Sequence, residues 1–197
     1  YTRVFVLPTP VVRDGIPRDV LVLGKAGRVW LLSTSETVPM NKRFYQPNNG
    51  RRPIQCKDKH GGSDRSTAVH LNNRGGELLI MGGCTSNDTA LQQLNLYNVQ
   101  TGSWDSYDLH IKRGVPASVF LADGRVLIIN GEDKSIDQNY FHQKNASGDP
   151  RYAQIFDPDK KSFTFVDTPE DVFRGYHNMA ALLRDGSVVL GGGFNQF

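Results

Sequence analysis

The sequence has no long run of apolar residues. No stretch of the 197-residue chain approaches the roughly 18 consecutive apolar residues that a membrane-spanning helix needs. The most apolar segment, from Val4 to Val12, is interrupted by Pro8 and Pro10. The sequence therefore predicts a protein without a membrane span.

The sequence also has no large excess of positive or negative charge. The formal net charge is +3, with 23 Lys and Arg residues against 20 Asp and Glu residues. The basic residues are dispersed, apart from Arg51–Arg52 and Lys160–Lys161. Because a nucleic-acid-binding domain normally carries a concentrated basic patch, we do not expect nucleic acid as a partner.

Only two cysteines, Cys56 and Cys84, are present. A disulfide between them would close one loop and stabilise the fold by roughly 3 to 4 kcal/mol in the chain-entropy model. Two buried thiols are the alternative, and the sequence leaves both readings open.

Two glycosylation sequons point to the compartment of the protein. Asn87-Asp88-Thr89 and Asn145-Ala146-Ser147 each lie in a polar segment that is typical of a surface loop. The chain begins at Tyr1 rather than at Met, so we expect a matured or excised chain whose targeting signal is not visible. These marks favour a secreted, glycosylated protein.

Glycine and proline separate short apolar runs along the chain. The 20 Gly and 10 Pro residues fall between these runs as turn residues, which favours many short strands over long helices. Three segments share one pattern of strand, turn, strand and glycine: Arg65 to Gly83, Arg113 to Gly131 and Arg174 to Gly192. The turns Asp123-Gly124 and Asp185-Gly186 predict two-residue hairpins of type I′.

A second pair of strand-like runs follows each of the first two segments. Four strands per repeat and a spacing near the roughly 50 residues of a kelch repeat predict propeller blades. The predicted fold is all-β, a partial kelch-like β-propeller of about three to four blades from a ring of six or seven. We expect one domain, 1–197, that begins with an incomplete three-stranded blade over about 39 residues and a linker over 40–62. Two blades follow, at 63–112 and at 113–173, and the second of them has a long exposed loop at 132–150. The start of a further blade lies at 174–197.

The last segment resembles the signature of the galactose oxidase and glyoxal oxidase family, the copper radical oxidases. That signature reads Arg-x-Tyr-His-Ser, then Leu-Leu-Pro-Asp-Gly and a terminal Gly-Gly, and here it is matched by Arg174-Gly175-Tyr176-His177-Asn178, Leu182-Leu183-Arg184-Asp185-Gly186 and Gly191-Gly192. The resemblance implies that Tyr176 is a weak axial copper ligand and His177 an equatorial one. Imidazole suits Cu(II), and an axial phenol can act as the base that takes the substrate hydroxyl proton.

Adjacent residues of a regular strand face opposite sides. Tyr176 and His177 can therefore both reach one metal ion only from an irregular strand entry, such as one next to Gly175. In the middle segment, the sequence frame sets Val115 against Tyr176 and Pro116 against His177, so that segment lacks the pair. The other histidines have no metal-ligand spacing; they are His60, His70, His110 and His142.

The family also uses a tyrosine cross-linked to a cysteine and a second histidine from a C-terminal domain. None of these is identifiable here, since neither Cys56 nor Cys84 lies in the family's sequence context. The chain is therefore expected to hold half a copper site and to be inactive alone, with the remainder of the propeller supplied by the same parent chain or a partner chain.

Two functions remain open. The resemblance favours a portion of an extracellular copper radical oxidase that oxidises a small alcohol or aldehyde and reduces O2 to H2O2. The alternative is a non-catalytic kelch-type propeller, a structural or carbohydrate-binding component of a matrix or cell wall.

Overall fold

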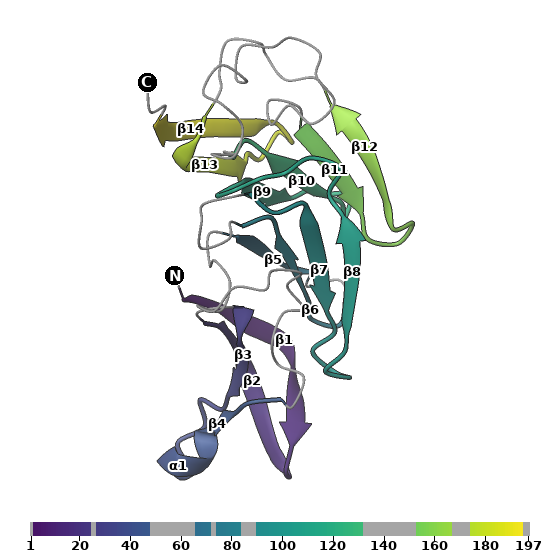
Figure 1. Ribbon diagram of the computed structural model, residues 1–197. Coiled ribbons are helices and arrows are strands. Elements are labelled where there is room, and N and C mark those ends of the chain that lie inside the picture. The colour runs from purple at the N-terminus through teal and green to yellow at the C-terminus, as the bar shows by residue number, and fades with distance from the viewer. Residues whose placement is uncertain are drawn as a thin grey trace.

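A computed structural model describes residues 2–24, 27–47, 66–71, 74–83, 90–131, 153–166 and 174–194. These residues form antiparallel sheets arranged in an arc (Figure 1). The predicted all-β class and the partial β-propeller are confirmed. No helix in the described ranges is both long and apolar enough to cross a membrane.

The first sheet, in chain order, has four strands. They are β1 (Arg3–Arg13), β2 (Ile16–Leu23), β3 (Val29–Leu32) and β4 (Phe44–Tyr45), with the one-turn helix α1 (Met40–Arg43) leading into β4. The sequence indicated three strands and a linker from residue 40 onward. The difference arises because the backbone of Ser33 bonds to Arg43, at 3.0 Å, and brings β4 alongside β3.

The next two sheets each have four strands in sequential order, and a hairpin follows them. The second sheet contains β5 (Thr67–Leu71), β6 (Glu77–Met81), β7 (Gln93–Tyr97) and β8 (Trp104–Asp108). The third contains β9 (Ala117–Phe120), β10 (Val126–Ile129), β11 (Ala153–Asp157) and β12 (Ser162–Val166). The hairpin pairs β13 (Tyr176–Leu182) with β14 (Val188–Phe194).

The second strand of each middle sheet is buried on both faces. In β6, Leu78 and Ile80 pack toward the first sheet, whereas Leu79 and Met81 pack toward the third. In β10, Val126 and Ile128 join the second sheet's side, and Leu127 and Ile129 join the side of the β13–β14 hairpin. Because side chains alternate along a strand, each of these strands contributes to two separate apolar clusters, one on each face of its sheet, which we call seams. Both faces need apolar residues, so the sequences of these strands are continuous apolar runs.

The hairpin turns differ from the prediction in their type. Leu121 pairs with Arg125, and the Gly124 N–H donates to the Leu121 carbonyl at 3.0 Å, so the loop has three residues. Gly124 has a φ of 86°, and Asp123 is not among the residues with positive φ. The turn is thus a type I turn with a glycine bulge, and the Leu183–Ser187 loop repeats its hydrogen bonds.

A two-residue type I′ turn occurs instead in the first sheet. Arg13 pairs directly with Ile16, and the two residues between them, Asp14 and Gly15, have φ values of 52° and 72°. Both central residues of a type I′ turn need positive φ, and this pair meets the requirement.

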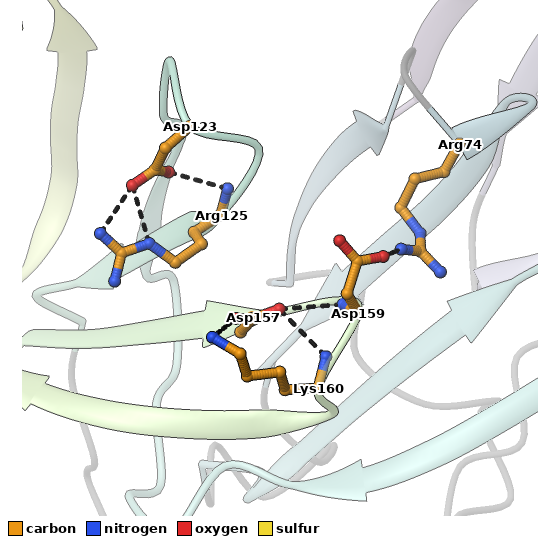
Figure 2. A network of polar contacts seen from close by, with 6 residues as sticks. All are labelled: Arg74, Asp123, Arg125, Asp157, Asp159 and Lys160. Carbon is orange, nitrogen blue, oxygen red and sulfur yellow. Dashed lines mark hydrogen bonds and ion pairs between the residues drawn. The ribbon is translucent and has the colours of Figure 1, made fainter.

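The turns at one end of the second and third sheets carry charged groups (Figure 2). Arg74 donates to Glu77 at 2.7 Å and also contacts the Asp159 carboxylate, which joins the two sheets at their turns. The side-chain hydrogen bond from Arg125 holds the pKa of Asp123 below its ordinary value. These turns lie at the opposite end of the strands from the point where β9 and β13 begin.

Candidate functional site

The innermost strands start next to one another in space. β9 contacts both β5 and β13 (Figure 1). The N–H of Gly83 donates to the carbonyl of Arg113 at 2.8 Å, and the N–H of Gly131 donates to the carbonyl of Arg174 at 3.4 Å. The second and third sheets are therefore each attached by their second strand to the entry of the following sheet, and the Tyr176–His177 pair lies directly after the last of these attachments.

β13 is irregular at His177. Tyr176 pairs with Phe194 and Asn178 pairs with Gly192, while His177 itself has a left-handed backbone with a φ of 61°. Its side chain is exposed. The left-handed residue makes the entry of β13 irregular, and an irregular entry is what the sequence analysis required of a pair that serves one metal ion. The side chain of Tyr176 lies outside the described part of the structure.

The neighbouring sheet has the same irregularity at Val115, which has a φ of 50°. Val115 lies two residues before Ala117, the partner of Ile129, and His177 lies two residues before Met179, the partner of Gly191. Val115 is thus the structural counterpart of His177, and the sequence frame that set it against Tyr176 was wrong by one residue.

The reason is an additional residue at the entry of β13. Arg113 and Arg174 correspond, because the Nη1 of each donates to a backbone carbonyl at the end of its own second strand: Asn130 and Gly192, respectively. One residue separates Arg113 from Val115, but two separate Arg174 from His177. Tyr176 therefore has no counterpart in the third sheet.

Close backbone contacts fix the position of His177. A Cβ atom built on Gly192 would lie 2.5 Å from the His177 carbonyl oxygen, so only glycine fits beside it. The side chain of Asn178 donates to the carbonyls of Gly175 and Val115 at 2.6 and 2.8 Å. Asn178 thereby ties the loop before β13 to the entry of β9.

A buried cation lies beneath the entry of the third sheet. Arg113 is fully buried, and its guanidinium donates to the Asn130 carbonyl at 2.7 Å and to Gln154 Oε1 at 3.2 Å. Hydrogen bonds of this kind compensate the cost of removing a charge from water. Arg113 therefore joins the end of β10, at Asn130, to β11, at Gln154. The next residue, Gly131, makes the bond to Arg174 before β13.

The described histidines of other sheets contact aromatic rings. His70 lies on β5, with its ring centroid 6.0 Å from that of Phe5. His110 lies 5.2 Å from Phe163 and 6.1 Å from Phe165. Within the described ranges, no three residues among His, Cys, Asp and Glu are grouped so that they could hold a metal ion.

Several residues singled out from the sequence lie outside the described residues: Cys56, Cys84, Asn87, Asn145, His60 and His142. The disulfide and both glycosylation sites remain predictions. Asn130 and Asn178 were not singled out, although one signal was available. Asn130 occupies the position that glycine holds in the other two repeats, as Gly82 and Gly192.

No protein-family model matches the sequence, and neither does any curated protein. Among solved structures, a fungal alcohol oxidase of the AA5 family in complex with copper superposes with a TM-score of 0.65 and 21% identity, over 88% of this chain and 34% of that chain. The structure of YjhT superposes with a TM-score of 0.54 and 15% identity, over 86% of this chain and 55% of that chain. The chain thus spans about a third of the first protein and about half of the second. At these identities the likeness shows a shared fold.

Proposed function

We propose that the chain is a portion of an extracellular copper radical oxidase of the glyoxal oxidase and galactose oxidase kind. Such an enzyme oxidises an alcohol or aldehyde and reduces O2 to H2O2. The observation that carries the proposal is the left-handed backbone of His177 directly after Tyr176, an irregular strand entry of the kind that such a ligand pair requires. The fold shared with a fungal copper alcohol oxidase supports it.

The residues fit one half of a copper site. His177 offers an exposed imidazole, a ligand that Cu(II) favours. Tyr176 would be the weaker of the two ligands. Because the described residues contain no cluster of three potential ligands, the other ligands would come from the rest of a longer protein.

Bound copper would supply one-electron redox chemistry. For an alcohol, the balanced reaction is RCH2OH + O2 → RCHO + H2O2. Tyr176 in its phenolate form would take the hydroxyl proton of the substrate. The constrained backbone of His177 would fix the position from which its imidazole ring binds.

The two ends of the arc offer surfaces for the rest of the propeller. Val4 and Val6, on the outer face of β1, are 63% and 75% exposed. At the other end, Met179 and Val189 are 58% and 45% exposed. Apolar sheet faces of this kind are normally covered, and further blades of the parent chain or of a partner chain would cover them.

The test uses the full protein that carries this chain. We expect His177→Ala to abolish copper retention and H2O2 production from small alcohols and aldehydes. His110→Ala is the matched control, because His110 is also exposed and also has a φ of 61°. The control variant should keep its copper. Unchanged copper content in His177→Ala, measured by atomic absorption on folded protein, would reject the ligand assignment.

A non-catalytic kelch-type propeller is the second candidate. The observation that favours it is that Val115 has the same left-handed backbone as His177, so the irregular strand entry also occurs in this fold without a metal ligand. Binding to wall or matrix polysaccharides by a full protein that takes up no copper would support this candidate and overturn the first.

A further inference from the structure

Asn130 departs from the repeat at a position that elsewhere is glycine. Gly82, Asn130 and Gly192 correspond in register and share one left-handed conformation, with φ values of 60°, 59° and 61°. Asparagine tolerates this conformation better than most residues, but glycine adopts it without a steric cost. The amide side chain of Asn130 is therefore placed there at a cost that the other two repeats avoid.

The Asn130 side chain is buried, and its donor has no partner among the described residues. Asn130 is only 3% exposed, and its Nδ2 makes no hydrogen bond within the part of the chain that the structure describes. A buried polar group without a partner destabilises the folded state. We therefore expect this N–H group to have a hydrogen-bond acceptor in the folded protein.

Two more buried polar atoms at the same seam lack a partner within the described ranges. They are Nε of Arg174 and Oδ1 of Asn178. The Asn178 amide cannot be reversed without loss, because its Nδ2 already donates to two carbonyls. Oδ1 is thus a true acceptor, whereas Arg174 Nε and Asn130 Nδ2 are donors.

One backbone bond and one side-chain bond place these three residues at the same seam. Gly131, which follows Asn130, donates its N–H to the carbonyl of Arg174 at 3.4 Å. Asn178 follows Arg174 by four residues and is tied to Val115 of the neighbouring strand entry. All three atoms therefore lie where the third sheet meets the β13–β14 hairpin.

We propose that one ordered water molecule binds at this seam. It accepts hydrogen bonds from Asn130 Nδ2 and Arg174 Nε and donates one to Asn178 Oδ1. An anion would be repelled by the amide oxygen and a cation by the two N–H groups, but a hydroxyl-type oxygen satisfies all three. Buried waters typically make about three such bonds. Because the atoms are closed to solvent, the occupant has to be as small as water.

A crystal structure of the protein at high resolution provides the direct test. The expected result is a single density peak at about 2.7–3.2 Å from all three atoms. A direct hydrogen bond between Asn130 Nδ2 and Asn178 Oδ1, or no peak at all, would overturn the proposal.

A substitution gives a second test whose sign discriminates. Asn130→Gly relieves the backbone cost, so the variant would be equally or more stable if the side chain bound nothing. If the water is present, the variant loses it and leaves two polar atoms unpaired, and the folding equilibrium constant should fall about tenfold. Asp14→Gly is the control, because it makes the same kind of change at an exposed turn with a φ of 52°. The control should be unchanged or slightly stabilised in urea titrations; a parallel gain in Asn130→Gly would contradict the proposal.

Discussion

A Cβ atom built on Gly82 would lie 2.2 Å from the carbonyl oxygen of Arg113 in the following sheet. The two sheets approach so closely here that no side chain fits. Gly82 also has a φ of 60°. Steric crowding and backbone conformation therefore both require glycine.

We expect Gly82→Ala to lower the free energy of unfolding by about 2 to 5 kcal/mol, the sum of a left-handed alanine and an overpacked seam. Gly15→Ala is the control, because Gly15 has a φ of 72° but a Cβ built on it would meet no atom of the described residues within 4 Å. It should cost only about 1 to 2 kcal/mol. Equal losses for the two variants in urea denaturation would show that the seam contact contributes nothing.

The type I′ turn at Asp14 and Gly15 gives a prediction about β-branched residues. Asp14→Val places a branched side chain at a φ of 52°, and we expect a loss of about 1 to 2 kcal/mol. Asp123→Val is the comparison, since Asp123 is not among the residues with positive φ and loses only exposed bonds to Arg125. Thermal denaturation should show the larger decrease in Tm for Asp14→Val. A larger decrease in Tm for Asp123→Val would show that the type I′ turn has been assigned to the wrong hairpin.

Tyr97 is a buried residue whose hydroxyl has no hydrogen-bond partner in the described part of the chain. Its ring packs against Trp104 at 4.7 Å, and burial raises its pKa to about 12. Removal of an unpaired buried hydroxyl is favourable, so Tyr97→Phe should be as stable as the parent or more stable by about 1 kcal/mol.

The same residue predicts a loss of stability at alkaline pH. The pKa is raised in the folded protein above its ordinary value of 10.0, so the unfolded chain loses this proton first as the pH rises. The contribution of the neutral Tyr97 hydroxyl to the free energy of unfolding is complete below pH 10, and it disappears between about pH 10 and 12. Urea midpoints measured across that range should fall more steeply for the parent than for Tyr97→Phe. Parallel curves would mean that Tyr97 ionises normally.

Much of the fold could be predicted from the sequence, because apolar runs recur at the same place in each repeat and Asp-Gly pairs recur in the last two. The turn type could not be predicted from the dipeptide alone. Asp123-Gly124 serves a three-residue loop in which the Asp123 carboxylate accepts the Arg125 N–H at 3.1 Å. The same dipeptide at Asp14-Gly15 spans two residues directly, because Arg13 and Ile16 are paired.

The candidate site was predicted less well, for a similar reason. The sequence pattern aligned Arg113 with Arg174 correctly, but it could not reveal that Tyr176 is an additional residue before the irregular backbone. Only strand register sets Val115 against His177. Asn130 stands where the other two repeats have glycine, but the sequence alone does not show that its side chain is buried beside unpaired polar atoms.

The alternating faces of β6 and β10 also affect how the molecule comes apart. Each seam is shared by two neighbouring sheets, and no single centre holds the described arc together. Stability in such an array is approximately a sum of nearest-neighbour terms. An end sheet can open by giving up one seam, whereas a middle sheet has to give up two. For residues 1–197 taken alone, amide hydrogen exchange should therefore begin at β1–β4 and at the β13–β14 hairpin and travel inward, and further blades packed on these two sheets would remove the difference.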